Sequence, residues 1–298
     1  RSVVVPADAS ALQSEASLQC DYRIDINVSI WLSNMILKKH AYVTGSTVAT
    51  NCFYHRGKTR GMEIRGTREC QACGRQWSYY ETGTIRCPDC EAIRSVGVDE
   101  RRQLHTDGAA ELDLEPIRQR LASEPLARVV DDLKDRLRSY TNTRGFINGG
   151  TLRPLDDRYL AARELLQAAD LAVRGRGATE AEELYVLDLL DGAVAGEWPP
   201  ETELPASLKA ARGLGVAEAV EAYRGDLRTW LDDHPDSEAA TTLGSLRDQL
   251  KRTEALQGEI PVETADALAD IAREIGDYIR GDDADALASA RDRLKRLQ

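Results

Sequence analysis

From about residue 114 to the C-terminus, apolar positions recur at intervals of three and four residues, which places them on one face of a helix. Five long stripes follow this rule, within residues 126–140, 155–173, 216–230, 265–279 and 287–297. Two shorter stripes are formed by Leu184, Leu187 and Leu190, and by Leu243, Leu246 and Leu250. Helices joined by short loops pack as antiparallel neighbours. We therefore expect residues 114–298 to form an acidic, antiparallel multi-helix bundle.

Capping signals support these helices. Thr179 followed by Glu182 is a capping-box pattern. Side chains that accept hydrogen bonds from a helix N-terminus are also expected at Asp236 or Ser237, and at Asp282 or Asp283 for the last helix. Glycine and proline break the pattern at 174–177, 196–205 and 258–261.

Residues 62–98 have a different character, because they hold two Cys-x-x-Cys pairs, Cys70/Cys73 and Cys87/Cys90. Four thiolates at this spacing form a tetrahedral site for Zn²⁺ and leave no position for a reactive water. We predict one structural Zn²⁺ held by the four cysteines; iron is the alternative, because a thiolate tetrahedron also suits it.

The ribbon around these cysteines is predicted from short strand patterns. A strand over residues 62–68 leads into the first pair, and residues 75–81 and 84–86 are expected to form a hairpin with Gly83 at its turn. Gly74 tolerates a positive φ after the first pair, and Pro88 stiffens the second turn. Such a short module has no sufficient apolar core, so the ion must supply folding free energy.

Several side chains of the ribbon allow two interpretations. Trp77, Tyr79 and Tyr80 either form a platform on which bases stack, or cover the metal site and dock the ribbon onto the helical region. Likewise Arg68, Arg75 and Arg86 either offset the negative charge of a four-thiolate centre or are ordinary solvated arginines.

The first 61 residues differ from the rest. The whole chain carries −11, and this segment carries seven basic and four acidic residues, so the remaining 237 carry −14. The segment lacks persistent periodicity. We expect Met62 to be the natural start and residues 1–61 to be translated in error; a mostly disordered extension is the alternative. Residues 99–113 are polar and predicted to be a linker.

Composition restricts the function. An acidic chain does not coat nucleic acid by bulk electrostatics, although a local contact is allowed. With no bilayer-length apolar run and no signal-peptide pattern, we expect a cytoplasmic protein without a membrane role. The acidic composition, poor in lysine (7, against 32 arginines), suits a high-salt cytoplasm in which a carboxylate surface stays soluble, or else reflects a GC-rich genome.

No catalytic constellation is visible. Phosphate-binding, nucleophile-elbow and metalloprotease motifs are absent, so no catalytic residue and no small-molecule substrate is predicted. The four histidines are isolated in the sequence. His105, in the predicted linker, is close enough along the chain to reach the metal, but the four cysteines already complete its coordination. Arg153 and Asp156 are the best candidate second site, although a helix N-terminus capped by Asp156 is the preferred interpretation of this stretch.

The cysteine turns resemble the zinc ribbon of transcription factor IIB-type proteins. The runs 64–83 and 95–100, with Arg144-Gly-Phe146, residues 152–157 and residues 205–212, resemble an uncharacterised haloarchaeal family whose members begin at a Met matching Met62. This resemblance covers 62–298 and implies zinc at the four cysteines, but no activity.

Together these observations favour a non-enzymatic zinc-ribbon adaptor, associated with transcription or nucleic acid through a macromolecular partner. The alternative is a protein-interaction scaffold whose helical bundle binds a protein partner and whose ribbon is purely structural.

Overall fold

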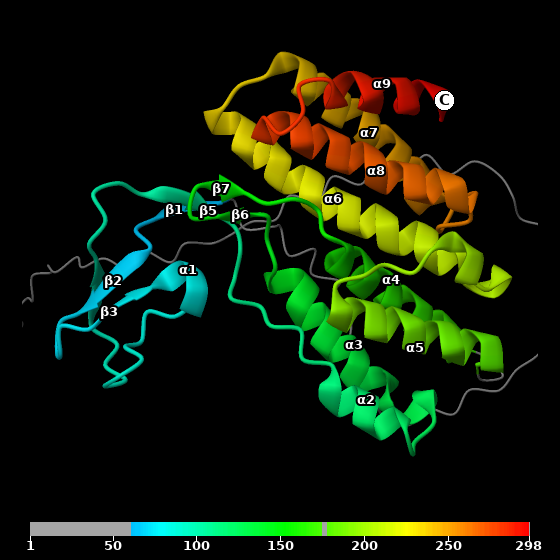
Figure 1. Ribbon diagram of the computed structural model, residues 1–298, viewed down its shortest axis with the longest axis horizontal. Helices are drawn as coiled ribbons and strands as arrows, with labels where there is room; N and C mark the ends of the chain where they lie inside the picture. The colour runs from blue at the N-terminus through cyan, green and yellow to red at the C-terminus, as the bar shows by residue number, and fades with distance from the viewer. Residues whose placement is uncertain (1–60, 175–177, 298) are drawn as a thin grey trace, which may run out of the picture. The chain divides into compact units, whose positions relative to one another are not determined.

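The computed structural model describes residues 61–174 and 178–297 of the chain (Figure 1). The predictions about residues 1–60, and residues 175–177 of the break predicted at 174–177, lie outside this part. Most of the described residues lie in helices, and the strands form three small antiparallel sheets. The predicted mainly helical class is therefore confirmed. The helices are α1 Tyr79–Thr82, α2 Glu115–Leu121, α3 Leu126–Thr143, α4 Asp157–Ala172, α5 Glu180–Ala195, α6 Lys209–Asp233, α7 Ser237–Ala255, α8 Val262–Arg280 and α9 Ala286–Arg296.

The strands are short. They are β1 Met62–Ile64, β2 Thr67–Cys70, β3 Gln76–Ser78, β4 Ser95–Gly97, β5 Gln103–His105, β6 Ile147–Asn148 and β7 Thr151–Leu152. β3, β2 and β4 form a three-stranded sheet in that order, while β1 pairs with β5 and β6 with β7. The predicted linker, residues 99–113, thus contains a strand that pairs with the start of the ribbon segment.

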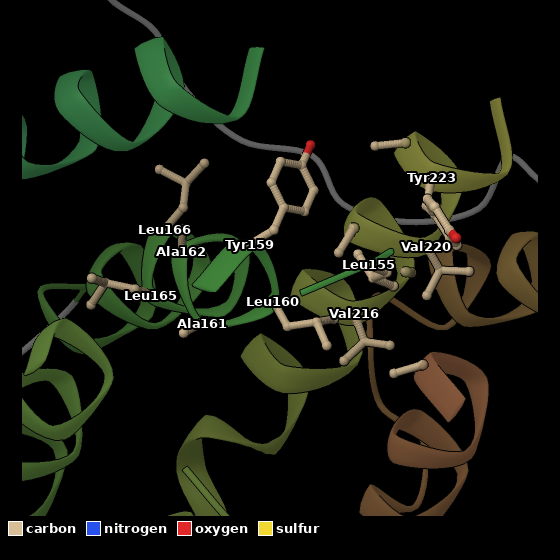
Figure 2. Packing of buried hydrophobic residues seen from close by; sticks show 14 of the residues in the cluster. Leu155, Tyr159, Leu160, Ala161, Ala162, Leu165, Leu166, Val216, Val220 and Tyr223 are labelled. Atoms are coloured by element: carbon tan, nitrogen blue, oxygen red, sulfur yellow. The ribbon is translucent and has the colours of Figure 1, made fainter. Parts of the chain in front are cut away.

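The helical bundle is built around α4 and α6 (Figure 1). α4 packs against α3, α5 and α6, and α6 also packs against α7 and α8. Small residues let α4 and α6 approach closely: a Cβ added at Gly215 would lie 2.6 Å from the Cα of Glu164. Figure 2 shows leucine, valine, alanine and tyrosine side chains of α4 and α6 meeting in this core.

Most predicted apolar stripes face this core. Leu126 to Tyr140 of α3 are buried at every predicted position, as are the three leucines of α7. The predicted face of α5 is wrong: Leu190 is buried, but Leu184 is 55% and Leu187 36% exposed. α5 instead buries Tyr185, Val186, Leu189, Leu190 and Ala193. It carries apolar residues on two sides, so spacing alone does not select the buried one.

The helix caps mostly agree with the sequence. Thr179 and Glu182 form a complete capping box, and Asp236 accepts hydrogen bonds from two backbone N–H groups at the start of α7. The cap predicted for the last helix is wrong, because α9 starts after Asp285 without a side-chain cap. Asp283 instead accepts a hydrogen bond from the Asp285 N–H, 2.9 Å away, within the preceding turn.

Candidate metal centre

The cysteine-bearing sheet differs from the predicted hairpin. β3 pairs with β2, and the chain then forms the short helix α1, which ends at Gly83 with φ 62°. Residues 84–86 are not a strand; the third strand is β4, after the second cysteine pair. The strand expected over 62–68 is split into β1 and β2. Gly66 lies in this break, where a Cβ would overlap the Tyr80 ring.

Each cysteine pair sits on the same backbone turn. The N–H of Cys70 donates to the Arg75 carbonyl (2.8 Å), and the N–H of Gly74 donates to the Cys70 carbonyl (2.9 Å). The second pair repeats both bonds from Cys87, with Ala92 and Glu91 at the equivalent positions. Both turns place the residue after the second cysteine in the left-handed region, with φ 75° at Gly74 and 58° at Glu91.

These turns bring the four sulfur atoms together. Cys70, Cys73, Cys87 and Cys90 have all their Sγ atoms within 4.8 Å of one another. The Sγ atoms of Cys70 and Cys90 are 3.6 Å apart, those of Cys73 and Cys87 3.6 Å, and those of Cys73 and Cys90 3.4 Å. A Zn–S bond of about 2.3 Å in a tetrahedron puts the sulfurs about 3.8 Å apart. The donor set and its spacing therefore fit a tetrahedral thiolate site.

Backbone N–H groups also face the sulfurs. The Ala72 N–H lies 3.4 Å from the Cys70 Sγ, and hydrogen bonds from the N–H groups of Ala72 and Cys73, with those to the neighbouring sulfurs, lower the pKa of Cys70 to about 6. The Arg75 N–H acts the same way on Cys73, but hydrogen bonding to the neighbouring sulfurs, Cys90 first, raises the pKa of Cys73 to about 12. Four crowded thiols do not all ionise unless a cation compensates the charge. Such electrostatics are those of a cation site.

The three flanking arginines bond to other protein groups. Arg68 donates to the Ser95 hydroxyl (2.9 Å) and carbonyl (2.8 Å), and Arg86 donates to the Glu91 carbonyl (3.0 Å). Arg75 lies 3.7 Å from the Asp89 carboxylate, with both side chains more than half exposed. Their bonds brace the sheet and the second turn.

Of the three aromatic side chains, Trp77 is buried, and Tyr79 and Tyr80 are half-buried. Trp77 is 8% exposed, packs with Cys70, Cys87 and Ala92, and donates its indole N–H to the Thr84 carbonyl (3.0 Å). Tyr80 belongs to α1, donates its hydroxyl to the Ile64 carbonyl (3.2 Å), and has its ring 5.0 Å from that of His105. The covering interpretation is therefore the one that the structure favours over a base-stacking platform.

His105 is not part of the cysteine cluster. It is buried, and its Nδ1 accepts a hydrogen bond from the Gly149 N–H (3.3 Å). Burial lowers the pKa of His105, partly offset by the nearby Asp107 carboxylate. Among the described residues, the four cysteines are the one group of three or more potential ligands that comes close enough to hold a metal.

The candidate second site, Arg153 and Asp156, belongs to an ion-pair network centred on the buried Asp107. Asp156 caps α4 by accepting from the Tyr159 N–H (2.9 Å), as the preferred interpretation predicted, and it also accepts from Arg144 (3.0 Å). Arg144 and Arg153 both donate to the buried carboxylate of Asp107 at 3.0 Å. Arg153 and Asp156 thus share a network through Asp107 that the sequence did not suggest, beside a cavity of about 810 Å³.

The core of the helical bundle contains a second polar cluster, which was not predicted from the sequence. Glu164 is fully buried and accepts hydrogen bonds from Tyr185 (2.5 Å), Trp198 (2.6 Å) and Arg212 (3.3 Å). Arg212 also binds Asp266 through two nitrogens, at 2.7 and 2.9 Å. Burial raises the pKa of Glu164, with Arg212 opposing it. The cluster satisfies its own groups and joins α4, α5, α6 and α8.

A signal for this cluster exists in the sequence. Glu164 lies four residues after Leu160 on the buried stripe of α4, and Arg212 lies four residues before Val216 on that of α6. A charged residue at an apolar position of such a stripe must be paired when buried. Two opposite charges at such positions indicate a core ion pair.

The fold and the cysteine cluster define a class: a protein with a small four-cysteine sheet module followed by a helical bundle. The chain belongs to a family described as "Family of unknown function (DUF7117)", whose model matches residues 62–294. The match includes all four cysteines of the cluster and nearly all of the helical bundle. No curated protein and no solved structure matches the chain. None of the described helices combines the length and apolarity needed to cross a membrane.

Proposed function

We propose that the protein is a non-enzymatic adaptor in which the four cysteines hold one structural Zn²⁺ and the ribbon so stabilised docks onto a protein partner. When bound, the ion would cross-link the two turns and supply folding free energy. All four donors belong to the protein, which supports a structural rather than a catalytic role.

The observation that carries the proposal is where the exposed apolar side chains lie. Ile85, Ile93, Val96 and Val98, here called the ribbon aliphatic set, are 42–63% exposed within one short module. Val96 lies in β4 and Val98 directly follows the strand; both are exposed, while Gly97 between them is half-buried. The Ser95 hydroxyl donates to the Ile85 carbonyl (2.6 Å), which holds Ile85 beside β4. Exposed aliphatic groups concentrated in this way are typical of protein interfaces.

The same side chains favour protein over nucleic acid as the direct ligand. Single-stranded nucleic acid is bound by aromatic stacking and a cationic groove. In the ribbon, Trp77 is buried, and the five arginines of residues 62–98 are balanced by five acidic residues. Association with transcription would then run through a protein, as the likeness to transcription factor IIB-type ribbons suggests. We propose a haloarchaeal origin as well, on the resemblance of residues 62–298 to a haloarchaeal family and on the acidic, lysine-poor composition.

The test is crosslinking and mass spectrometry in native host lysate with the zinc-loaded chain. We expect crosslinks from residues 85–98 to a protein that survive nuclease treatment and disappear in an Ile93→Ser/Val96→Thr variant. Leu256→Ser, which changes a similarly exposed leucine (45%) at the end of α7, is the matched control and should keep them.

Loss of the crosslinks on nuclease treatment would contradict direct docking onto a protein and would show that the contact depends on a nucleic acid. Identical crosslinks from the Ile93→Ser/Val96→Thr variant would contradict docking through the ribbon. Elemental analysis of the same preparation reads out the metal separately, because four-cysteine coordination predicts one zinc per chain.

A further inference from the structure

The second concentration of exposed apolar side chains is on α5. Every large hydrophobic side chain exposed on a described helix belongs to it: Leu184 (55%), Leu187 (36%) and Val194 (42%). The opposite side of α5 packs against α4. A helix apolar on both sides is normally buried on both, so the outward side of α5 has the composition of an interface.

The outward residues form one straight line along the helix. Glu180, Leu184, Leu187, Asp191 and Val194 follow one another at intervals of four, three, four and three residues, and all are exposed. This is the spacing by which one helix contacts another in a coiled coil. We call these five residues the α5 outer seam.

A small cavity adjoins the seam. It is lined from α5 by Glu183, Val186 and Leu187, and from the end of α2 to the start of α3 by Leu121, Glu124, Pro125 and Leu126. Its volume of about 70 Å³ is far below the 300–1,000 Å³ of a ligand site. Five of its seven lining residues are apolar, so it suits the tip of one inserted aliphatic side chain, as a docked helix would supply.

The charge along α5 selects the partner. The helix contains five acidic residues, Glu180, Glu182, Glu183, Asp188 and Asp191, and no basic residue. Asp191 pairs with Arg118 of α2 (3.2 Å), while Glu180, Glu183 and Asp188 have no ion-pair partner among the described residues. Acidic side chains within the seam and beside its three apolar residues attract Lys or Arg and repel a second acidic copy.

We propose that the α5 outer seam is the docking site for a basic amphipathic helix of a partner protein. Leucine-like anchors of that helix contact Leu184, Leu187 and Val194, and its lysines or arginines face Glu180, Glu183 and Asp188. Two copies of this chain would set these carboxylates against each other, so a heterotypic contact is favoured. The site is separate from the ribbon and does not require the metal.

The probe is a fluorescein-labelled 18-residue peptide with leucine at heptad positions a and d and lysine at e and g, titrated with full-length protein in 0.1 M KCl. We expect saturable binding by fluorescence anisotropy, at least tenfold weaker for Leu184→Gln/Leu187→Gln. The charge variant Glu183→Gln/Asp188→Asn should weaken binding about threefold and reduce its dependence on salt.

Two controls separate this contact from general attraction to an acidic protein. Leu256→Gln and Asp248→Asn change an exposed leucine and an exposed aspartate outside α5 and should bind like the unchanged chain. A peptide with glutamate at e and g should not bind. Because all these side chains are exposed, the variants are expected to fold normally, which circular dichroism checks.

The proposal is overturned if the lysine peptide does not bind, or binds Leu184→Gln/Leu187→Gln equally well. It is also overturned if light scattering shows a dimer that this variant abolishes, since the seam would then hold a second copy. The Ile93→Ser/Val96→Thr variant should keep full peptide binding, so the failure of ribbon docking and the failure of this site are distinguishable.

Discussion

The ribbon and the helical bundle exclude water by different means. The bundle has a continuous core of leucine, alanine, valine and tyrosine side chains that joins α2 to α9. The buried cluster of the ribbon is Cys70, Trp77 and Cys87, with Ala92 beside it. Burial of apolar area stabilises the first, whereas three side chains are too few for the second. The comparison therefore predicts that the ribbon is stabilised by an ion held between its four sulfur atoms, whereas the bundle is stabilised by its own apolar core.

Removing the metal should break the ribbon and spare the bundle. Structural zinc contributes about 10–16 kcal/mol in small zinc domains. With chelator, or in Cys73→Ser, we expect backbone amides of residues 62–98 to lose nearly all protection from hydrogen exchange. Helical circular dichroism should change little. Unchanged protection at residues 67–97 in metal-free protein would mean that the sheet stands without the ion.

The converse test breaks the bundle. Arg212→Leu leaves Glu164 buried without its cation, which costs about 3–5 kcal/mol, to be measured by urea denaturation. Arg212→Leu/Glu164→Gln should recover part of the loss, because no isolated charge is then buried. Arg247→Leu, on the exposed side of α7, is the control and should cost under about 0.5 kcal/mol. Equal losses in Arg212→Leu and Arg247→Leu would contradict the role of the core ion pair.

A smaller effect compares the two cysteine turns. Gly74→Ala forces a side chain into a left-handed conformation at a cost of about 1 kcal/mol, although a Cβ there meets no neighbour within 4 Å. Glu91→Gly removes the same strain and should tighten metal binding. Competition with a chromophoric chelator measures both, with about fivefold weaker zinc affinity expected for Gly74→Ala. Shifts of the same sign would show that the turns are not equivalent.

The smallest expected effect lies where the two regions meet. Because burial lowers the pKa of His105 below its ordinary value of about 6.5, the unfolded chain binds more protons below that pH, and stability falls as the pH falls. Protonation also removes the bond that Nδ1 accepts from Gly149. Melting temperatures at pH 7.5 and 5.5 should differ more for the unchanged chain than for His105→Gln. The exposed His234→Gln should behave like the unchanged chain.

The bundle was more predictable from sequence than the ribbon. Long stripes such as Leu126 to Tyr140 extend over several turns of helix, so their period is unambiguous. In the ribbon, strands of three or four residues are too short to show a period, and pairing is set by where the sulfurs must meet. That is why the cysteine spacing predicted the cluster while the partner of β3 was predicted wrongly.

Two features required knowledge of tertiary structure. α5 has apolar residues on both sides, and its orientation follows from Tyr185, which reaches the buried Glu164. The Asp107 network draws Arg144 and Arg153 from separate segments, and neither distance along the chain nor residue type indicates that pairing. The Asp156 cap, by contrast, depends on neighbours within three residues and was predictable.

The paired turns have a consequence for how this family can vary. In each turn the bonds that fix the fold run between main-chain atoms, and the two residues enclosed by the cysteines, Gln71 and Ala72 or Pro88 and Asp89, project into solvent. At Gln71 and Ala72, substitutions other than proline keep these main-chain bonds and cost the scaffold little, whereas Pro88 stiffens its turn and Asp89 pairs with Arg75. Divergence at Gln71 and Ala72 among homologues would therefore be neutral, while changes at the sulfurs or at the left-handed residue would report altered ion binding.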